Sequence, residues 1–281
     1  MPTVRLTLTV PDGHRETLVA ELSEWGFDAF EERDDALLAY APARAWTDTA
    51  REAVAGWLDA VGAPPPVDEV LPEQNWNAAW EASIQPLAVG AFVVAPTWAE
   101  APDLDGRTRL TIDPKMAFGT GYHETTRIVL RLVPGAVGAM PVPSVLDVGT
   151  GTGVLAIAAL KLAAKATAVG VDIDPWSATN ATENAALNGV ADRFAVREGS
   201  IEAVPESGFG LVVANIIRSI VEPMYPDLVA KRAPGAPLVL SGLLVTERDA
   251  AVAQLGALGL ALVEEASENE WWGGVFGTAA Q

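Results

Sequence analysis

The sequence contains no cysteine, only two histidines and only four lysines. Without cysteine, neither a disulfide framework nor a thiolate metal site can form. Two histidines, His14 and His123, are too few for a common zinc site, so we expect no metal cofactor. The apolar run from Val154 to Leu160 is far shorter than the roughly 20 residues that cross a bilayer. The first residues, MPTVRLTLTVPDG, also lack the pattern of an export signal, so we expect a cytoplasmic protein without membrane contact.

Basic residues are scarce relative to acidic ones. Eighteen Lys and Arg face 37 Asp and Glu, which gives a formal net charge of -19. Proteins that bind free DNA or RNA usually present a basic surface, so we expect no direct binding of nucleic acid. The acidity has two interpretations: it attracts a basic protein partner, or it is an adaptation to solubility or high salt.

The N-terminal residues 1–72 have the pattern of a small α+β domain. Apolar residues alternate over Val4 to Val10, as in a half-buried strand, and residues 18 to 25 follow helical spacing. Two short strands then flank residues 34–35, and Thr47 is placed to cap a second helix. Residues 67–71 supply a last strand. The resulting β-α-β-β-α-β order predicts a ferredoxin-like domain.

Residues 73–90 have the pattern of a helical linker, and residues 91–281 that of a larger domain. Trp76 and Trp80 lie one helical turn apart in the linker and serve either to pack against a neighbouring domain or to line a ligand site. The segment from Pro64 to Gly90 is also a candidate hinge between the two domains. From residue 91 onward, strands alternate with helices, which predicts a parallel, doubly wound sheet with helices on both faces. Ligands of such sheets bind at the carboxyl ends of the strands.

A glycine loop in VLDVGTGTGVLAIAA joins a strand to a helix. Gly149, Gly151 and Gly153 allow a tight turn and bring a ligand close to the backbone at the N-terminus of the helix. The dinucleotide fingerprint would require a third glycine at position 154, which is valine here, and the charge of Asp147 would repel a pyrophosphate. An acid at this place instead suits a cationic ligand such as S-adenosylmethionine, which carries an ammonium and a sulfonium group.

A second acid strengthens this interpretation. Asp172 ends the next predicted strand, 23 positions after Gly149, where a carboxylate can accept both ribose hydroxyls of an adenosine. Asp174, directly before Pro175, is better placed to cap a helix. The combination resembles class I S-adenosylmethionine-dependent methyltransferases, which implies a Rossmann-like, doubly wound seven-stranded sheet.

Further segments narrow the resemblance to one family. GFDAFEE, QNWNAAWEASIQPLAVG, IDPKMAFGTGYHETT, VLDVGTGTGVLAIAALKL, VGVDIDP, ENAALNGV and VVANII occur in family order between about residues 26 and 245. With them the chain resembles the PrmA family, the methyltransferases of large-subunit ribosomal protein eleven. The resemblance implies that the N-terminal domain recognises the substrate, and that lysine side chains and the N-terminal α-amine of that basic protein are methylated. We expect a monomer.

The same resemblance implies a set of cofactor-binding positions. They are Thr126, Gly149, Asp172 and Asn215, with Phe118, Gly119 and Thr120 in the first glycine segment, AFGTGYHETT. Two departures concern their surroundings. Lys115 stands where the family often has glycine after Asp-Pro, and Ile216 follows Asn215 where many amine methyltransferases have proline.

Methyl transfer to nitrogen needs an uncharged amine held in line with the methyl group and no covalent enzyme intermediate. Neutralising a lysine at pH 7 costs about 4.6 kcal/mol, against about 1 to 1.4 kcal/mol for an α-amine. We predict that Asn215 orients the amine or the methionine end of the cofactor. His123 is the second catalytic candidate, either as a proton acceptor or as a hydrogen bonder that fixes the loop.

Two alternatives stay open from the sequence. The first is an S-adenosylmethionine-dependent methyltransferase that acts on another protein, on RNA or on a small molecule. The second belongs to another class: a ribosome-associated module that binds S-adenosylmethionine without catalysis. The acidic charge disfavours RNA, and the presence of Asp147, Gly149, Asp172 and Asn215 together favours a catalyst.

Overall fold

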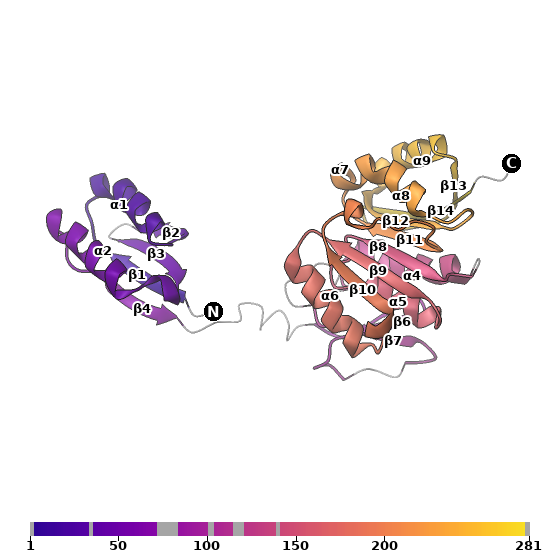
Figure 1. The fold of residues 1–281 in the computed structure, drawn as a ribbon, viewed down its shortest axis with the longest axis horizontal. Coiled ribbons are helices and arrows are strands. Elements are labelled where there is room, and N and C mark those ends of the chain that lie inside the picture. The colour runs from indigo at the N-terminus through magenta and orange to yellow at the C-terminus, as the bar shows by residue number, and fades with distance from the viewer. Residues whose placement is uncertain are drawn as a thin grey trace. The chain divides into compact units, whose positions relative to one another are not determined.

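The computed structural model describes residues 3–33, 36–71, 84–100, 104–114, 121–138 and 141–278. The chain divides into two compact units, Met1–Ala78 and Ala79–Gln281, which Figure 1 shows. Trp76 and Trp80, together with the rest of residues 72–83 of the predicted linker, lie outside the described residues. The far end of that linker forms a strand at Leu87–Val89 instead of continuing a helix. Within the described ranges, no helix is both long and apolar enough to cross a membrane.

The N-terminal unit has the predicted ferredoxin-like order. Its elements are β1 (Thr3–Leu8), α1 (Asp12–Glu24), β2 (Ala29–Glu32), β3 (Leu37–Pro42), η1 (Ala43–Ala45), α2 (Asp48–Ala60) and β4 (Val67–Leu71). The strands form an antiparallel sheet in the order β2-β3-β1-β4. Both helices pack on the same face of this sheet, since Leu22 of α1 and Val54 of α2 share one core with Leu6 of β1. The Thr47 hydroxyl accepts a hydrogen bond from the Ala50 N–H at 3.2 Å, so the predicted cap is confirmed.

The C-terminal unit contains the predicted seven-stranded sheet. Its strands are β8 (Ser144–Val148), β9 (Thr167–Asp172), β10 (Phe194–Glu198), β11 (Leu211–Asn215), β12 (Leu238–Leu244), β13 (Leu260–Glu268) and β14 (Trp271–Thr278). They follow the order β10-β9-β8-β11-β12-β14-β13. The expectation of a parallel sheet fails at one strand, because β14, which lies between β12 and the edge strand β13, runs antiparallel to both. Only residues 269 and 270 separate β13 from β14, and so short a connection permits only an antiparallel hairpin.

Helices cover both faces of the large sheet (Figure 1). On one face lie α4 (Glu124–Gly138), α5 (Val154–Leu162) and α6 (Pro175–Leu187), and on the other lie α7 (Arg218–Val221), η4 (Glu222–Met224), α8 (Tyr225–Lys231) and α9 (Arg248–Ala257). Consecutive residues of β8 contribute to the two cores in turn, Val145 to the first and Leu146 to the second. Between β11 and β12 the helical part of the chain is divided into α7, η4 and α8. Pro223 and Pro226 explain the division, because proline lacks the N–H that a helix interior requires.

A second, three-stranded sheet was not predicted from the sequence. Its strands are β5 (Leu87–Val89), β6 (Phe92–Ala95) and β7 (Thr108–Thr111), with β5 antiparallel and β7 parallel to β6. Phe92 and Leu110 are completely buried in the same core as α4 and α5. The chain therefore passes through this sheet between the start of the C-terminal unit and the first glycine segment.

Candidate functional site

The carboxyl ends of three adjacent strands bring the predicted site residues together. In the register, Val148 of β8 lies opposite Val171 of β9 on one side and Ala214 of β11 on the other. Gly149, Asp172 and Asn215 are the next residues of these three strands, so they lie level with one another at one edge of the sheet. This is the edge at which doubly wound sheets bind ligands.

The loop after β8 depends on its glycines. Gly149, Gly151 and Gly153 have φ angles of 70°, 53° and 80°, the left-handed region that other residues rarely adopt. A Cβ atom at Gly149 would lie 2.9 Å from the Ile216 side chain, so this position has no room for one. The N–H groups of Gly149 and Thr150 both donate to the Val171 carbonyl at 2.9 Å, which fastens the start of the loop to β9. A narrow, rigid loop results, and α5 begins directly after it at Val154.

Asp147 supports this loop from inside the protein. Its side chain is completely buried, and its Oδ2 accepts hydrogen bonds from the Thr150 hydroxyl at 2.8 Å and from the Ala156 N–H at 3.2 Å. Burial raises the pKa of the Asp147 carboxyl to about 6, while these two hydrogen bonds oppose the rise. The carboxylate thus caps the first turn of α5 and ties the loop to β8. Its attraction for a cationic ligand stays a prediction.

Asp172 bridges the loop and the helix that follows β9. One carboxylate oxygen accepts from the Gly151 N–H at 2.8 Å and the other from the Asp174 N–H at 3.0 Å. A carboxylate offers about four lone-pair positions, so two remain for further donors such as ribose hydroxyls. Asp174 has the different role predicted for it: it caps α6 by accepting from the Trp176 and Ser177 N–H groups. The two acids of the Asp-Ile-Asp sequence therefore differ in their contacts: Asp172 bonds the glycine loop, and Asp174 caps α6.

Asn215 carries an unsatisfied polar atom at the end of β11. Its Nδ2 lies 3.5 Å from the hydroxyl of Thr126, a fully buried residue in the first turn of α4. Its Oδ1 is buried and has no hydrogen-bond partner among the described residues. Leaving a buried acceptor unpaired costs about 1 to 3 kcal/mol, so such an atom indicates a place where a ligand donates. The structure thus brings Thr126 and Asn215 together, as a common site requires.

His123 lies at the start of α4, directly after the first glycine segment. Its Nδ1 accepts from the Thr125 N–H at 3.3 Å and lies 2.9 Å from the Thr125 hydroxyl, which is the geometry of a helix N-cap. Its ring also contacts Trp271 edge to face, with centroids 5.1 Å apart. These contacts favour the loop-fixing interpretation, although they leave proton transfer untested. Phe118, Gly119 and Thr120 lie outside the described residues, so their assignment stays a prediction.

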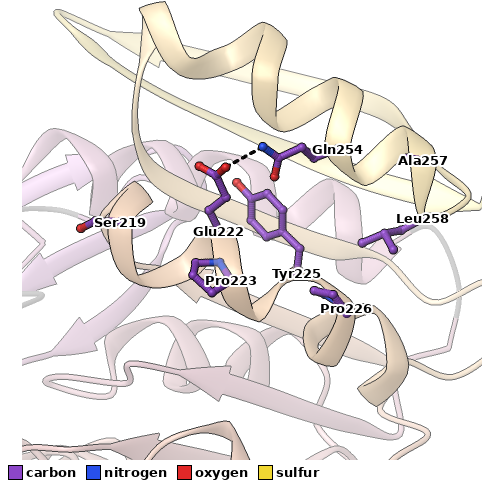
Figure 2. A pocket seen from close by; sticks show the side chains of 8 residues that line it. All are labelled: Ser219, Glu222, Pro223, Tyr225, Pro226, Gln254, Ala257 and Leu258. Atoms are coloured by element: carbon purple, nitrogen blue, oxygen red, sulfur yellow. Dashed lines mark hydrogen bonds between the residues drawn. The ribbon is translucent and has the colours of Figure 1, made fainter.

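Two cavities lie on the side of the sheet covered by α7 to α9. One has a volume of about 370 Å³ and is reached two residues after Asn215, at Ile217; it is lined by Ile217, Arg218, Ser219, Glu222, Gly242, Leu244, Glu247 and Trp271. Figure 2 shows the second, of about 590 Å³, where the Glu222 carboxylate accepts from the Gln254 amide at 2.6 Å. Ser219 and Glu222 line both cavities, so the second continues the first away from Asn215.

Several contributors to this site were missed by reasoning from sequence. They include Thr150, which bonds Asp147, Trp271, which contacts His123, and Asn184 of α6, which donates to the Thr152 carbonyl in the glycine loop at 3.0 Å. Asn180, Asn184 and Asn188 recur every four residues, which is a signal that could have placed them on one face of α6. In the part of the chain that the structure describes, no group of three or more His, Cys, Asp or Glu residues could hold a metal ion.

The chain is similar to known proteins of one family. The sequence profile of the family described as ribosomal protein L11 methyltransferase (PrmA) matches residues 32–276. A protein of that name from Pelobacter propionicus is 34% identical over 271 residues, covering 90% of this chain and 87% of the relative. Another, from Chlorobaculum tepidum, is 34% identical over 274 residues, covering 95% and 94%. The crystal structure of a ribosomal protein L11 methylase from Lactobacillus delbrueckii subsp. bulgaricus superposes with a TM-score of 0.63 at 29% identity, covering 70% of this chain and all of that one.

Proposed function

The chain belongs to the ribosomal protein L11 methyltransferase (PrmA) family, and we propose that it transfers methyl groups from S-adenosylmethionine to amino groups of ribosomal protein L11. The acceptors are lysine side chains and the N-terminal α-amine. The observation that supports this most strongly is the unpartnered Oδ1 of Asn215, next to the glycine loop and at the carboxyl edge of the sheet. An amide oxygen there is complementary to the N–H of an amine.

The residues around the loop fit S-adenosylmethionine. The backbone of Gly149 to Gly153 approaches the ligand closely, and the two remaining acceptor positions of Asp172 suit the ribose hydroxyls of its adenosine. Thr126 and Asn215 lie on the other side of Gly149, where the methionine end belongs. When bound, S-adenosylmethionine supplies a methyl group on a positively charged sulfur.

The contribution of the chain to the reaction is to hold the amine uncharged and correctly oriented. An amine that donates one N–H to the Asn215 Oδ1 has its direction fixed, so that its nitrogen lone pair is free for the methyl group. Asn215 acts by orientation and needs no charge of its own. Ordering two reactants in this way contributes several kcal/mol to lowering a barrier. The proton that the amine must lose passes to water or to His123, which lies at the N-cap of α4.

The acceptor enters, in our proposal, through the cavity of about 370 Å³ that is reached two residues after Asn215. Its walls combine the apolar surfaces of Ile217 and Trp271 with the carboxylates of Glu222 and Glu247. The Arg218 guanidinium, which is hydrogen-bonded to Glu222, holds the pKa of that carboxyl below its usual range, so the group stays charged. An apolar wall with acidic groups suits a lysine side chain, whose stem is apolar and whose tip is a cation before it loses its proton.

The proposal extends to the partner and the location. A net charge of -19 favours association with a basic ribosomal protein and disfavours a direct grip on nucleic acid. The proposed site is built from one chain, which suits a monomer. A substrate that belongs to the ribosome places the reaction in the cytoplasm. Residues 1–72 form the proposed recognition domain, residues 73–90 the linker and residues 91–281 the catalytic domain.

Label transfer tests this function. Large ribosomal subunits from a strain that lacks the family's enzyme are incubated with the chain and S-adenosylmethionine labelled in the methyl group, and the proteins and RNA are then separated. We expect label on amines of ribosomal protein L11, located by peptide mass mapping. Label in the RNA would support the RNA methyltransferase instead, and cofactor binding without any transfer would support the non-catalytic module.

A further inference from the structure

Three buried asparagines, two on α6 and one at its C-cap, hold the open edge of the chain at the end of β7 and just beyond it. Asn180, Asn184 and Asn188 are 2%, 0% and 6% exposed, although asparagine is usually a surface residue. Asn188 accepts from the Thr111 N–H at 3.0 Å and donates to the Thr111 carbonyl at 2.7 Å. Asn184 accepts from the Asp113 N–H at 3.0 Å, and Asn180 donates to the Asp113 carbonyl at 3.0 Å. The side-chain amides therefore take the place of a neighbouring strand.

The spacing of helix and strand explains why this arrangement fits. Four residues of helix rise about 6 Å, and two residues of strand rise about 6.6 Å, so amides at every fourth helix residue meet every second strand residue. The intervening residue, Ile112, turns its N–H the other way, to the carbonyl of Ala95, the last residue of β6, at 3.1 Å. Each edge of this segment is thus satisfied, one by a strand and the other by side chains.

Asn184 differs from its neighbours in reaching the glycine loop as well. Its Nδ2 donates to the carbonyl of Thr152, between Gly151 and Gly153, at 3.0 Å. The helix also touches the loop directly, since a Cβ atom added to Gly153 would lie 3.2 Å from that of Ala181. One buried side chain therefore connects the glycine loop with Asp113, which stands two residues before the start of Lys115–Thr120 in the sequence.

We propose that Asn184 is a positioning residue for the cofactor, which holds the glycine loop and the chain that enters the first glycine segment at a fixed separation. The inference rests on the proposed function, because it assigns both segments to one S-adenosylmethionine. Asn184 acts through the backbone of Thr152 and Asp113 and does not itself contact the ligand. Its loss weakens cofactor binding beyond any general loss of stability.

A matched pair of variants separates positioning from stability. In both Asn184→Asp and Asn188→Asp, a carboxylate oxygen replaces a nitrogen that donates to two backbone carbonyls: those of Thr152 and Asp113 in the first case, and those of Thr111 and Asn184 in the second. Both losses occur at buried positions, one on α6 and one at its C-cap, but only the first touches the glycine loop. Binding of S-adenosylhomocysteine, the product form of the cofactor, is measured by calorimetry on the full chain well below the unfolding temperature.

We expect Kd to rise about tenfold in Asn184→Asp and to change less than about threefold in Asn188→Asp, as the loss of one buried hydrogen bond at the loop implies. In each variant, the KM for S-adenosylmethionine should rise by the same factor as Kd, and kcat should change less than KM. Equal values of Kd in the two variants, whether both weak or both normal, overturn the proposal. Failure of the unaltered chain to bind either compound instead overturns the proposed function on which it rests.

A measurement on the unaltered chain covers the case in which Asn184→Asp does not fold. Amide hydrogen exchange is followed with and without saturating S-adenosylhomocysteine. We expect the Asp113 amide, which donates to Asn184, to exchange at least several-fold more slowly when the ligand is bound, and the Thr111 amide, which donates to Asn188, to change less. The same exchange rate at Asp113 with and without ligand contradicts the coupling.

Discussion

The side-chain nitrogen of Asn215 lies 3.5 Å from the hydroxyl of Thr126, a contact between residues 89 positions apart in the chain. It joins the end of β11 to the first turn of α4 and turns the opposite atom, Oδ1, to a place where no described residue donates to it. A distance of 3.5 Å is at the long limit for a hydrogen bond, so the contact contributes little energy and serves mainly to orient the side-chain amide of Asn215. Asn215 is thus held in one orientation with its acceptor available to a ligand.

The two acids after β9 should respond differently to removal. Asp172→Ala deletes the carboxylate assigned to the ribose, and we expect binding of S-adenosylhomocysteine to weaken about a hundredfold, as the loss of charge-assisted hydrogen bonds implies. Asp174→Ala removes only the cap of α6 and should lower the free energy of unfolding by about 1 kcal/mol with Kd nearly unchanged. Calorimetric titration and urea unfolding of both variants check this. Similar values of Kd in the two would contradict the assignment of Asp172.

The buried carboxyl of Asp147 predicts a pH dependence of stability. Its folded pKa of about 6 lies above the ordinary 3.8, so the folded state holds the proton more tightly than the unfolded state does. The stabilisation is therefore fully present below pH 3.8 and is lost as the pH rises through 6, a change on the order of 3 kcal/mol. Asp147→Asn removes this titration, while the amide oxygen can still accept from Thr150 and Ala156.

Urea unfolding between pH 4 and pH 8 measures the effect. Relative to the unaltered chain, Asp147→Asn should become more stable as the pH rises over this range, with most of the change between pH 4 and pH 6. A difference between the two proteins that stays constant with pH would show that the carboxyl is not perturbed by burial in the folded state.

The two interpretations of His123 are separable by one conservative change. Asn is among the best N-cap residues, so His123→Asn keeps an acceptor for the Thr125 N–H but cannot take up a proton at neutral pH. If His123 fixes the loop, as its contacts favour, kcat should stay within about threefold of the unaltered value, and His123→Ala should lower stability by about 1 kcal/mol. A large fall of kcat in His123→Asn, with stability intact, would identify proton transfer instead.

Local signals in the sequence were sufficient for much of the fold. Thr47 and Asp174 cap their helices as predicted, because N-caps depend on residues only two or three positions away. The same holds for the glycine loop, whose positive φ angles follow from the glycines themselves. The expectation of a parallel sheet was wrong at β14, because the direction of this strand depends on its hairpin with β13, which strand and helix alternation does not reveal.

The tertiary contacts of the site, by contrast, could not be predicted from local signals in the sequence. Asp147 stands at its predicted place beside the loop, yet its burial and its hydrogen bonds to Thr150 and Ala156 depend on the packing of α5 over β8. The regular spacing of the three asparagines is visible in the sequence, but their partners, Thr111 of β7 and Asp113 after it, are 77 and 71 residues away. Residues of a ligand-binding motif can be recognised in a sequence, whereas residues that hold such a motif in place are identified from the tertiary contacts of the structure.

Methyl transfer with and without the Asn215 side chain tests the central claim most directly. Purified ribosomal protein L11 is incubated with saturating S-adenosylmethionine and either the unaltered chain or Asn215→Ala, and the gain of methyl groups is followed by intact mass. We predict methylation by the unaltered chain and a rate at least about a hundredfold lower in Asn215→Ala, with unfolding in urea nearly unchanged, because orientation of the amine is lost. Equal rates would contradict the role of Asn215, and no methylation by the unaltered chain would contradict the proposed function itself.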